Sequence, residues 1–305
     1  MTDTREAPPR EGLPSLPADF VLPVDKPEGP TSHDVVGAVR RALGRRRVGH
    51  TGTLDPFASG LLLVCVGKTT RLAEYLSGLD KTYEAVARVG ETTDTLDREG
   101  EVVEVRDGWA ELDRAQIEAA LARFEGRIDQ VPPAFSAKKV RGEAAHRRAR
   151  RGETVLLAPA SVAVHELELT SLELPLVGFR MRCSSGTYVR ALARDVGAEL
   201  GVGAHLVALR RTAIGTFGVE GALPVDRLED GAALAAAAIE PLEALAHLPR
   251  LVADDAEAAL LSQGRPLEGV DESLDGLVAV AHDGALLAVG ESAGGVLRPR
   301  KVFGA

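Results

Sequence analysis

The chain has 305 residues, 45% of them hydrophobic and 27% charged, a composition that is ordinary for a globular protein of one large or two smaller domains. Its formal net charge is −9, which taken alone argues against a nucleic-acid partner. The two cysteines, Cys65 and Cys183, lie in apolar runs, which excludes a disulfide scaffold or zinc ribbon and favours a reducing, cytoplasmic setting. No apolar stretch approaches the ~20 residues that span a bilayer, and no signal peptide is expected.

Charge is segregated along the chain. Residues 40–47 contain five arginines and no acid, and residues 138–151 contain seven basic side chains and one acid, whereas 91–113 and 220–275 are acidic. A single basic run is typical of a solvated helix face. Two such runs, one of them adjoining the loop at 49–60, instead favour a surface that contacts phosphates.

The polar, proline-rich residues 1–19 are expected to be a disordered tail. The elements that follow are predicted from apolar periodicity and from capping residues. The first half is expected to contain, in order, a strand at 20–24, a helix from Thr31 or Ser32 to Leu43, a buried strand at 61–66, a helix capped by Thr69 or Thr70, a strand at 81–89 and a helix from Asp113 to Phe124.

The second half continues this mixture of strands and helices. It is expected to contain strands within 161–184, a helix capped by Ser185 or Thr187, a strand at 207–217, an alanine-rich helical connector at 222–250, a helix capped by Asp254 or Asp255, and strands at 277–281 and 285–289. Because hairpin-like strand pairs are common, the pattern predicts an α+β fold with a mixed, largely antiparallel central sheet and flanking helices. Residues 20–248 are expected to form one domain and 249–305 a small β-rich module.

The loop at 49–60, Gly-His-Thr-Gly-Thr-Leu-Asp-Pro-Phe-Ala-Ser-Gly, directly precedes the apolar run at 61–66. Such a polar loop attached to a rigid buried strand is a common place for function. Pro56 disfavours the helical region for Asp55, so its carboxylate should stand on extended backbone. Most loop Asp-Pro pairs are simple turns, however, and loop chemistry alone favours a turn for this one.

Longer sequence blocks around this loop are more specific. They are 49–62, Asp25-Lys26-Pro27-x-Gly29-x-x-Ser32, Lys81-Thr82-Tyr83, Ser136-Ala137-x-Lys139-x-x-Gly142, Ser185-Gly186-Thr187-Tyr188-Val189-Arg190 and Leu209-Arg210-Arg211. In this order, over roughly residues 20–215, the chain resembles the TruB family of pseudouridine synthases, which acts on the T-arm uridine at position 55 of tRNA. The resemblance implies the fold of that family, without a cofactor or a metal.

The resemblance also implies roles for individual residues. Asp55 matches the nucleophile, which is ionised near neutral pH because the reference pKa of aspartate is about 3.9. Arg190 matches the arginine that pairs with it. It stands in the first turn of its expected helix, where a cation is disfavoured by ~0.3–1 kcal/mol unless a carboxylate offsets it. Tyr83 matches the tyrosine that stacks on uracil, with proton acceptance as a second role.

Further matching residues are expected to bind the substrate. Tyr188 and Leu209 match residues that line the base pocket, and His50 matches the histidine that fills the space vacated when the base flips out of the RNA. The remaining expected substrate-binding residues are Lys26, Lys139, Arg141 and Arg150, the last three in a basic RNA-binding arm at about 130–153. His146 in this arm stands where the family is expected to have a tyrosine, and 249–305 resembles, by position, a PUA-type RNA-binding module.

The expected reaction cuts the N-glycosidic bond, rotates the base and rejoins it through C5, so it needs a nucleophile and a dry pocket but no metal or redox step. Attack of the carboxylate on uracil C6 or on ribose C1′ both remain open. Two rival functions also remain: a non-catalytic RNA-folding module that uses the same surface, and an aspartate-nucleophile hydrolase of a small substrate. The expected partner is the T arm of tRNA, bound by a cytoplasmic monomer, with no membrane and no metal.

Overall fold

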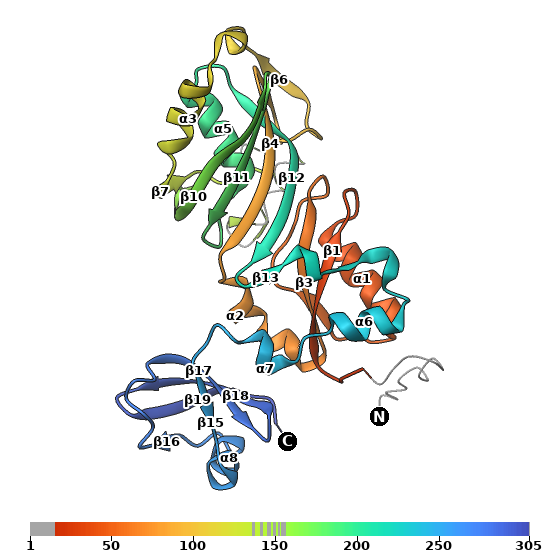
Figure 1. Cartoon of the computed structure of the whole chain (residues 1–305), viewed down its shortest axis with the longest axis vertical. Helices are drawn as coiled ribbons and strands as arrows, with labels where there is room; N and C mark the ends of the chain where they lie inside the picture. The colour runs from red at the N-terminus through yellow and green to blue at the C-terminus, as the bar shows by residue number, and fades with distance from the viewer. Residues whose placement is uncertain are drawn as a thin grey trace.

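The computed structural model of the chain describes residues 16–135, 138–140, 143–144, 148, 151, 153 and 157–304. Its main body is built on a ten-stranded sheet, and a second, five-stranded sheet forms a C-terminal module (Figure 1). The expectations for residues 1–15, for Arg141, His146 and Arg150, and for the side chain of Lys139 lie outside the described residues. Within the described part, no helix has both the length and the apolarity to cross a membrane.

The ten-stranded sheet is mixed but mostly antiparallel, which confirms the predicted α+β class. Only β1 with β14 and β3 with β12 pair in parallel within it. Along its main path the strands are β14 (Leu223–Pro224), β1 (Phe20–Lys26), β3 (Ser59–Val66), β12 (Ala204–Ile214), β4 (Lys81–Val89), β11 (Leu176–Cys183), β10 (Ala160–Glu173) and β7 (Gly126–Gln130). Two short strands, β2 (Val48–His50) and β13 (Phe217–Gly218), pair with β3 and β12.

The N-terminal half of this sheet is covered by helix α1 (Ser32–Leu43), as the sequence predicts. Thr31 and Asp34 form a reciprocal capping box at its start, and Gly44 ends it in a left-handed conformation with φ of 64°. Its apolar face packs on β1 and β3 together with α6 (Gly231–Ala237). Because β3 is buried along nearly its whole length, it is a rigid support for the loop that leads into it.

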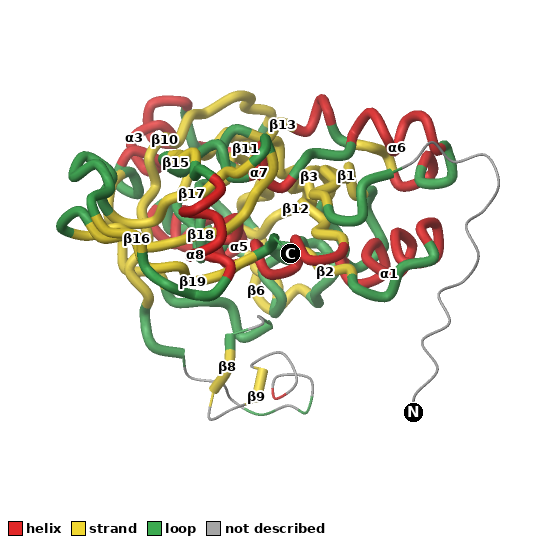
Figure 2. The backbone as a smooth tube through the Cα atoms, turned by 90° about the horizontal axis from the view of Figure 1, so that it is seen from below, coloured by secondary structure: helices red, strands yellow, loops and turns green. Residues whose placement is uncertain are grey.

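The other half of the sheet carries α3 (Arg114–Ala122) and α5 (Val189–Glu199) on one face (Figure 1). The inner side of α5 is buried against β4, β11 and β12, so the first turn of α5 lies at a fixed place in the core. Two further hairpins are β5 (Glu91–Thr93) with β6 (Val102–Val105), and β8 (Lys139–Val140) with β9 (Glu143–Ala144). Figure 2 shows β8 and β9 standing apart from both sheets.

The C-terminal sheet contains β15 (Arg250–Val252), β17 (Gly276–His282), β18 (Ala285–Ala293), β19 (Val296–Val302) and β16 (Leu267–Glu268), in that spatial order. Helix α8 (Asp255–Ser262) is capped by Asp254, and the β17–β18 hairpin turns through Asp283-Gly284, both at positive φ. The module also packs on α7 (Pro241–Ala244) and α2 (Ala73–Ser77). Arg71 Nη1 donates to the carbonyl of Val302 at 2.6 Å, and Lys301 Nζ donates to the carbonyl of Arg71 at 2.7 Å, so the module is joined to the main body by charged as well as apolar contacts.

Two predicted helix caps are wrong. Thr69 and Thr70 lie inside a 3-10 helix, η1 (Gly67–Leu72), and the hydroxyl of Thr69 donates to the carbonyl of Phe20 instead of accepting from a helix N–H. Helix α5 begins after Tyr188 and has no side chain of its own as a cap, while the hydroxyl of Thr187 donates to the carbonyl of Ser184. In both cases the threonine hydroxyl donates to a carbonyl at the end of a strand, at Phe20 of β1 or at Ser184 just after β11.

Smaller corrections concern element boundaries. Helix α3 ends at Ala122 rather than at Phe124, and β12 begins at Ala204, before the predicted strand. The predicted helical connector at 222–250 contains α6 and α7 but also β14, which extends the sheet beside β1. Short edge strands of this kind carry too few residues for a periodic signal.

At Gly60 the backbone lies directly against that of Arg211 on β12. The φ of Gly60 is 106°, and an added Cβ would overlap the backbone of Arg211, whereas Gly29, with φ of 101°, has open space around the same position. We predict that Gly60→Ala lowers the free energy of unfolding by clearly more than the ~1 kcal/mol expected of Gly29→Ala, which adds backbone strain alone. Urea unfolding of both variants measures the difference, and equal losses would contradict the close approach.

Candidate active site

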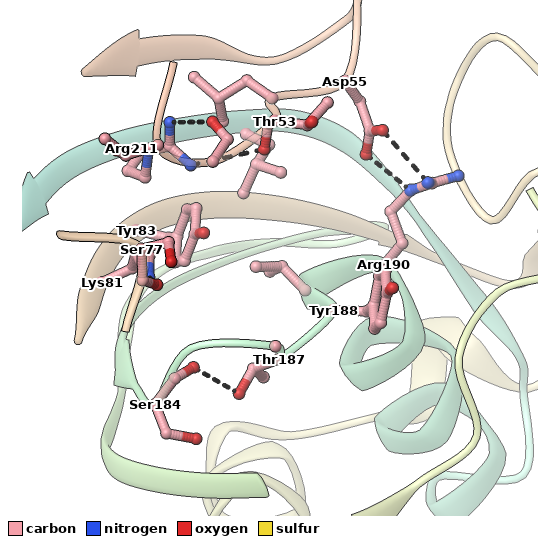
Figure 3. Close-up of a pocket in the computed structure, with 16 residues that line it drawn as sticks. Thr53, Asp55, Ser77, Lys81, Tyr83, Ser184, Thr187, Tyr188, Arg190 and Arg211 are labelled. Carbon is pink, nitrogen blue, oxygen red and sulfur yellow. Dashed lines mark hydrogen bonds and ion pairs between the residues drawn. The ribbon is translucent and has the colours of Figure 1, made fainter. Parts of the chain in front are cut away.

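A cavity of about 270 Å³ opens where the loop before β3, the strands β4 and β12 and the start of α5 meet. Figure 3 shows side chains from all four elements turned toward it. It brings together five of the residues that were assigned a role from the sequence, and Arg211, which was noted there only as part of a sequence block. These six are Asp55, Tyr83, Tyr188, Arg190, Leu209 and Arg211.

The loop that carries Asp55 is held by polar contacts to its main chain before and after this residue. The hydroxyl of Ser32 accepts the N–H of Leu54 at 2.8 Å and donates to its carbonyl at 3.1 Å. On the other side of Asp55, the carbonyl of Pro56 accepts Lys26 Nζ at 3.3 Å and the N–H of Gly29 at 2.8 Å. The carboxylate therefore extends from a short backbone segment that is held on both sides.

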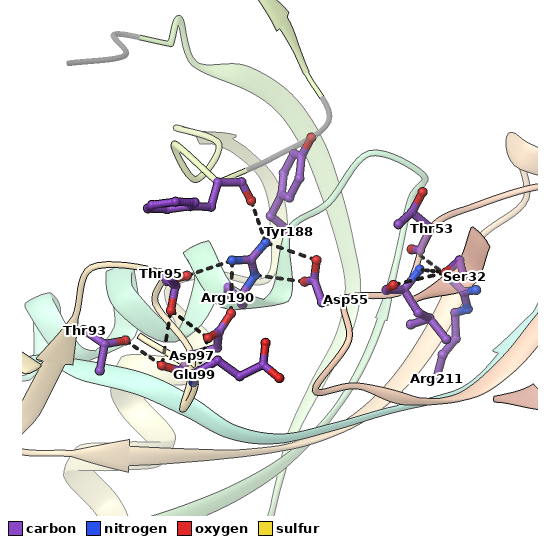
Figure 4. Close-up of polar contacts among 12 residues, drawn as sticks. Ser32, Thr53, Asp55, Thr93, Thr95, Asp97, Glu99, Tyr188, Arg190 and Arg211 are labelled. Atoms are coloured by element: carbon purple, nitrogen blue, oxygen red, sulfur yellow. Dashed lines mark hydrogen bonds and ion pairs between the residues drawn. The ribbon is translucent and has the colours of Figure 1, made fainter. Parts of the chain in front are cut away.

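Arg190 holds that carboxylate in a bidentate ion pair (Figure 4). Its Nε donates to Asp55 Oδ2 at 2.9 Å and its Nη2 to Asp55 Oδ1 at 3.3 Å. Nη1 donates to the carbonyl of Thr95 at 2.7 Å and to Asp97 Oδ2 at 3.1 Å, and Nη2 donates to the carbonyl of Phe135 at 2.9 Å. All five N–H groups of this buried guanidinium are thus used.

Asp97 is a member of the site that the sequence analysis missed. Its side chain is as buried as that of Arg190, both at 6% exposure, whereas that of Asp55 is 35% exposed. Its second oxygen accepts the hydroxyl of Thr95 at 2.6 Å and the N–H of Glu99 at 3.0 Å. Asp97 therefore balances the charge of Arg190 on the side away from the cavity, and Asp55 is the carboxylate that lines the cavity.

The electrostatics of Asp55 reflect two opposing effects. Removal from water raises the pKa of its carboxyl, and the negative charge of Asp97 raises it further, while the guanidinium of Arg190 lowers it. The net direction is upward from the ordinary aspartate value. A desolvated carboxylate that is still paired with a cation is suited to react with an electrophile, because little water has to be displaced from it.

Tyr83 and Arg211 form the wall opposite Arg190. Burial raises the pKa of the Tyr83 phenol, and the Arg211 guanidinium opposes that rise, so the phenol stays protonated near neutral pH. Arg211 Nε donates to the carbonyl of Leu61 at 2.7 Å, and its Nη2 donates to the carbonyl of Gly52 at 3.1 Å. Arg211 thereby ties the loop to β3 and β12, a role that its place in a sequence block did not reveal.

The other expected substrate-binding residues are placed differently. Tyr188 and Leu209 line the cavity. Lys26 is fully buried, and its Nζ donates to the carbonyls of Pro27 and Pro30, both at 2.8 Å, as well as to that of Pro56. This burial lowers the pKa of Lys26 to about 8, against the pull of the nearby Asp55 carboxylate. In this position the Lys26 ammonium group is not exposed to contact a substrate directly.

His50 lies on β2, pairs with Val64 of β3, and does not line the cavity. Its Nδ1 is buried without a hydrogen-bond partner among the described residues, and burial lowers the pKa of its imidazole. In the parts of the chain that the structure describes, no group of three or more His, Cys, Asp or Glu side chains could hold a metal ion.

The mixed sheet, the cavity at its centre and the pairing of Asp55 with the buried Arg190 are those of a protein of the pseudouridine synthase fold. A crystal structure titled as the archaeal box H/ACA sRNP Nop10-Cbf5 complex matches with a TM-score of 0.70 and 26% identity, over 93% of this chain and 86% of that one. A structure of an H/ACA RNP bound to a substrate RNA containing 2′-deoxyuridine matches with a TM-score of 0.69 and 26% identity, over 97% and 93% of the two chains.

Sequence comparison makes the assignment specific. Residues 40–189 match the model of the TruB family pseudouridylate synthase N-terminal domain, and residues 190–253 match that of the tRNA pseudouridylate synthase B C-terminal domain. The tRNA pseudouridine synthase B of Thermobifida fusca is 47% identical over 94% of this chain and 99% of its own length. The chain therefore belongs to the TruB family of pseudouridylate synthases.

The two carboxylates around Arg190 give a prediction for titration. Because the charge of Asp97 raises the pKa of Asp55, Asp97→Asn should lower that pKa, so that Asp55 ionises at lower pH than in the wild type. Carbon-detected NMR titration of the aspartate carboxyls measures this shift, with Asp55→Asn identifying the resonance. A midpoint that stays in place or moves upward would contradict the arrangement in Figure 4.

Proposed function

We propose that this protein converts the T-arm uridine at position 55 of tRNA to pseudouridine, with Asp55 as the nucleophile. The observation that carries the proposal is the Asp55–Arg190 pair, which presents one partly exposed carboxylate to a cavity lined by Tyr83, Tyr188 and Leu209. Relatives that are named tRNA pseudouridine synthase B and match nearly the whole chain support tRNA as the substrate.

In the proposed reaction the ionised Asp55 attacks the target nucleoside, at uracil C6 or at ribose C1′, and the bond between C1′ and N1 breaks. The uracil then turns and C5 bonds to C1′. The bond to the Asp55 oxygen breaks and regenerates the carboxylate, N1 takes up a proton and the proton on C5 is lost. Arg190 holds the carboxylate in line and balances its charge through these steps. The neutral phenol of Tyr83 offers a flat apolar wall for the uracil, and water is kept out by the buried sides of the cavity.

A uridine that is stacked inside the T loop must first leave the stack, at a cost of a few kcal/mol, roughly. We propose that RNA contacts outside the cavity offset this cost. Arg41 and Arg46 at the end of α1 are exposed, and their charge can neutralise backbone phosphates. His50, at the start of the loop but outside the cavity, is the side chain proposed to occupy the space that the base vacates.

The rival functions account for less of the structure. A non-catalytic RNA-folding module needs the basic surface but has no use for a desolvated carboxylate paired with a buried arginine. A hydrolase of a small substrate would use Asp55 but not the arginine-rich end of α1. The isomerase uses both, and RNA remodelling accompanies it because the base has to be flipped.

The remaining parts of the proposal concern setting and partners. We propose a monomer that works in the cytoplasm and binds tRNA without a metal or a cofactor, with residues 249–305 as a PUA-like RNA-binding domain. Both cysteines are buried free thiols, and burial raises the pKa of Cys65 to about 12 and that of Cys183 to about 11. Thiols of this kind are inert and fit a reducing compartment.

Asp55→Asn tests the proposed role of the carboxylate. The variant should lose pseudouridine formation, measured as tritium released from tRNA labelled at C5 of uridine, because an amide cannot serve as the nucleophile. Binding of tRNA, measured by filter retention, should persist, since the phosphate contacts are unchanged. Mapping of the modified position by carbodiimide adducts and reverse transcription should place it in the T arm.

If Asp55→Asn still released tritium, the assignment of Asp55 as the nucleophile would be refuted. If the wild-type protein bound tRNA and released no tritium, the non-catalytic rival would hold instead. Failure of the wild type to bind tRNA would point to a small substrate.

A further inference from the structure

Two buried polar side chains make the same unusual contact on opposite sides of the ion pair. The hydroxyl of Ser32 bonds both the N–H and the carbonyl of Leu54, at 2.8 and 3.1 Å. The carboxamide of Gln130 bonds both the N–H and the carbonyl of Tyr188, also at 2.8 and 3.1 Å. We use the term backbone clamp for one side chain that bonds both main-chain groups of one distant residue.

Each backbone clamp lies directly upstream of one half of the ion pair. Leu54 is the residue before Asp55, and Tyr188 is two residues before Arg190. Ser32 and Gln130 are 2% and 1% exposed, so water does not compete for either set of bonds. Neither contact is local, because Ser32 lies on α1 and Gln130 at the end of β7.

Gln130 also satisfies one of the free N–H groups at the start of α5. Helix α5 has no capping bond from the side chain of Tyr188, its N-cap residue, and the N–H of Tyr188 is accepted by Gln130 instead. Ser32 likewise does not cap its own helix, because Thr31 performs that role on α1. Both hydrogen-bonding side chains are thus free to fix the chain segment that carries a site residue.

The segment after Gln130 reaches the same side of the site. The carbonyl of Val131 accepts Arg194 Nη2 at 3.0 Å, and the carbonyl of Phe135 accepts Arg190 Nη2 at 2.9 Å. The start of α5 and residues 130–135 are therefore joined through three residues of the helix and its cap. A displacement of Gln130 would move Tyr188 and the Phe135 carbonyl, and both flank Arg190.

We propose that Ser32 and Gln130 are matched positioning residues that hold the Asp55 carboxylate and the Arg190 guanidinium in register. A bidentate pair tolerates little relative movement of its two backbones, and a misplacement of about 1 Å can reduce a rate ~100-fold. An ion pair whose carboxylate is one-third exposed contributes little when its side chains are free to move. The two backbone clamps restrict this movement because they fix the main chain next to Asp55 and at the start of the helix that carries Arg190. The inference rests on the proposed function only for its rate measurement.

The test uses variants that remove the hydrogen bonds and leave the volume nearly unchanged. Gln130→Met keeps the length of the side chain, and Ser32→Ala removes only the hydroxyl oxygen. Gln116→Met is the matched control, because Gln116 also accepts the N–H of a helix N-cap, that of Asp113 on α3, away from the cavity. Gln116 is exposed, whereas Ser32 and Gln130 are buried, so the free energy of unfolding of all three variants is also measured in urea to separate a general loss of stability from a loss of positioning.

Single-turnover tritium release and tRNA affinity are measured for the full-length variants across pH. Gln130→Met and Ser32→Ala should lower the rate roughly 10- to 100-fold with tRNA affinity within about twofold of the wild type. When Arg190 is held less firmly, its guanidinium lowers the pKa of Asp55 less, so the acid limb of the pH–rate profile should move to higher pH. Gln116→Met should change neither quantity.

Wild-type rates and an unmoved acid limb in both clamp variants would overturn the inference. A rate loss that appears equally in Gln116→Met would do the same, because it would reflect stability alone. Should Gln130→Met fail to fold, Ser32→Ala decides the matter by itself. A wild-type protein that binds tRNA but releases no tritium would be a failure of the proposed function, and the inference would then be judged by the Asp55 carboxyl titration, which should still shift upward in both variants.

Discussion

The buried guanidinium of Arg190 is the constraint on which the rest of the site depends. Removing a cation from water carries a penalty on the order of several kcal/mol, which is offset only when its hydrogen bonds and its charge are satisfied. Three separate parts of the chain supply the acceptors, namely the loop at Asp55, the turn at Thr95 and Asp97, and the carbonyl of Phe135, while α5 supplies the scaffold. The segments that meet at the cavity are thus held together through the guanidinium of Arg190.

Two carboxylates share that charge unequally, and this leaves Asp55 as the carboxylate that we propose reacts. Asp97 is enclosed and hydrogen-bonded on both oxygens, so it is a fixed counter-ion. Asp55 is partly exposed, and the pKa of its carboxyl is raised by burial and by Asp97. The fold therefore holds a carboxylate that is only partly stabilised, at the edge of the cavity that we propose accepts a base.

The sequence predicted the elements whose signals are local. The alternation of apolar and polar residues at 81–89 correctly predicted β4 and its buried face, and the capping residues around α1 correctly predicted both ends of that helix. Asp55, Arg190 and Tyr83 were found through sequence blocks, and the structure brings all three to one cavity, although their chemical roles remain proposals.

What the sequence could not predict depends on contacts between distant residues. Asp97 pairs with a residue 93 positions away, and Gln130 bonds one 58 positions away, so neither leaves a periodic pattern. Lys26 was expected at the substrate, and lysines are mostly exposed, yet the converging carbonyls of three prolines hold this one inside the fold. The two misplaced helix caps have the same origin, because carbonyls outside the helices compete for the hydroxyls of Thr69 and Thr187.

The most direct measurement is a crystal structure of the Asp55→Asn variant bound to a T-arm RNA hairpin. The account predicts that the target uridine is turned out of its stack, with its ring against Tyr83. The substituted side chain at position 55 should then lie within about 4 Å of uracil C6 or ribose C1′, a near-attack distance. A uridine that remains stacked in the RNA, or one bound away from the Arg190 guanidinium, would contradict the account.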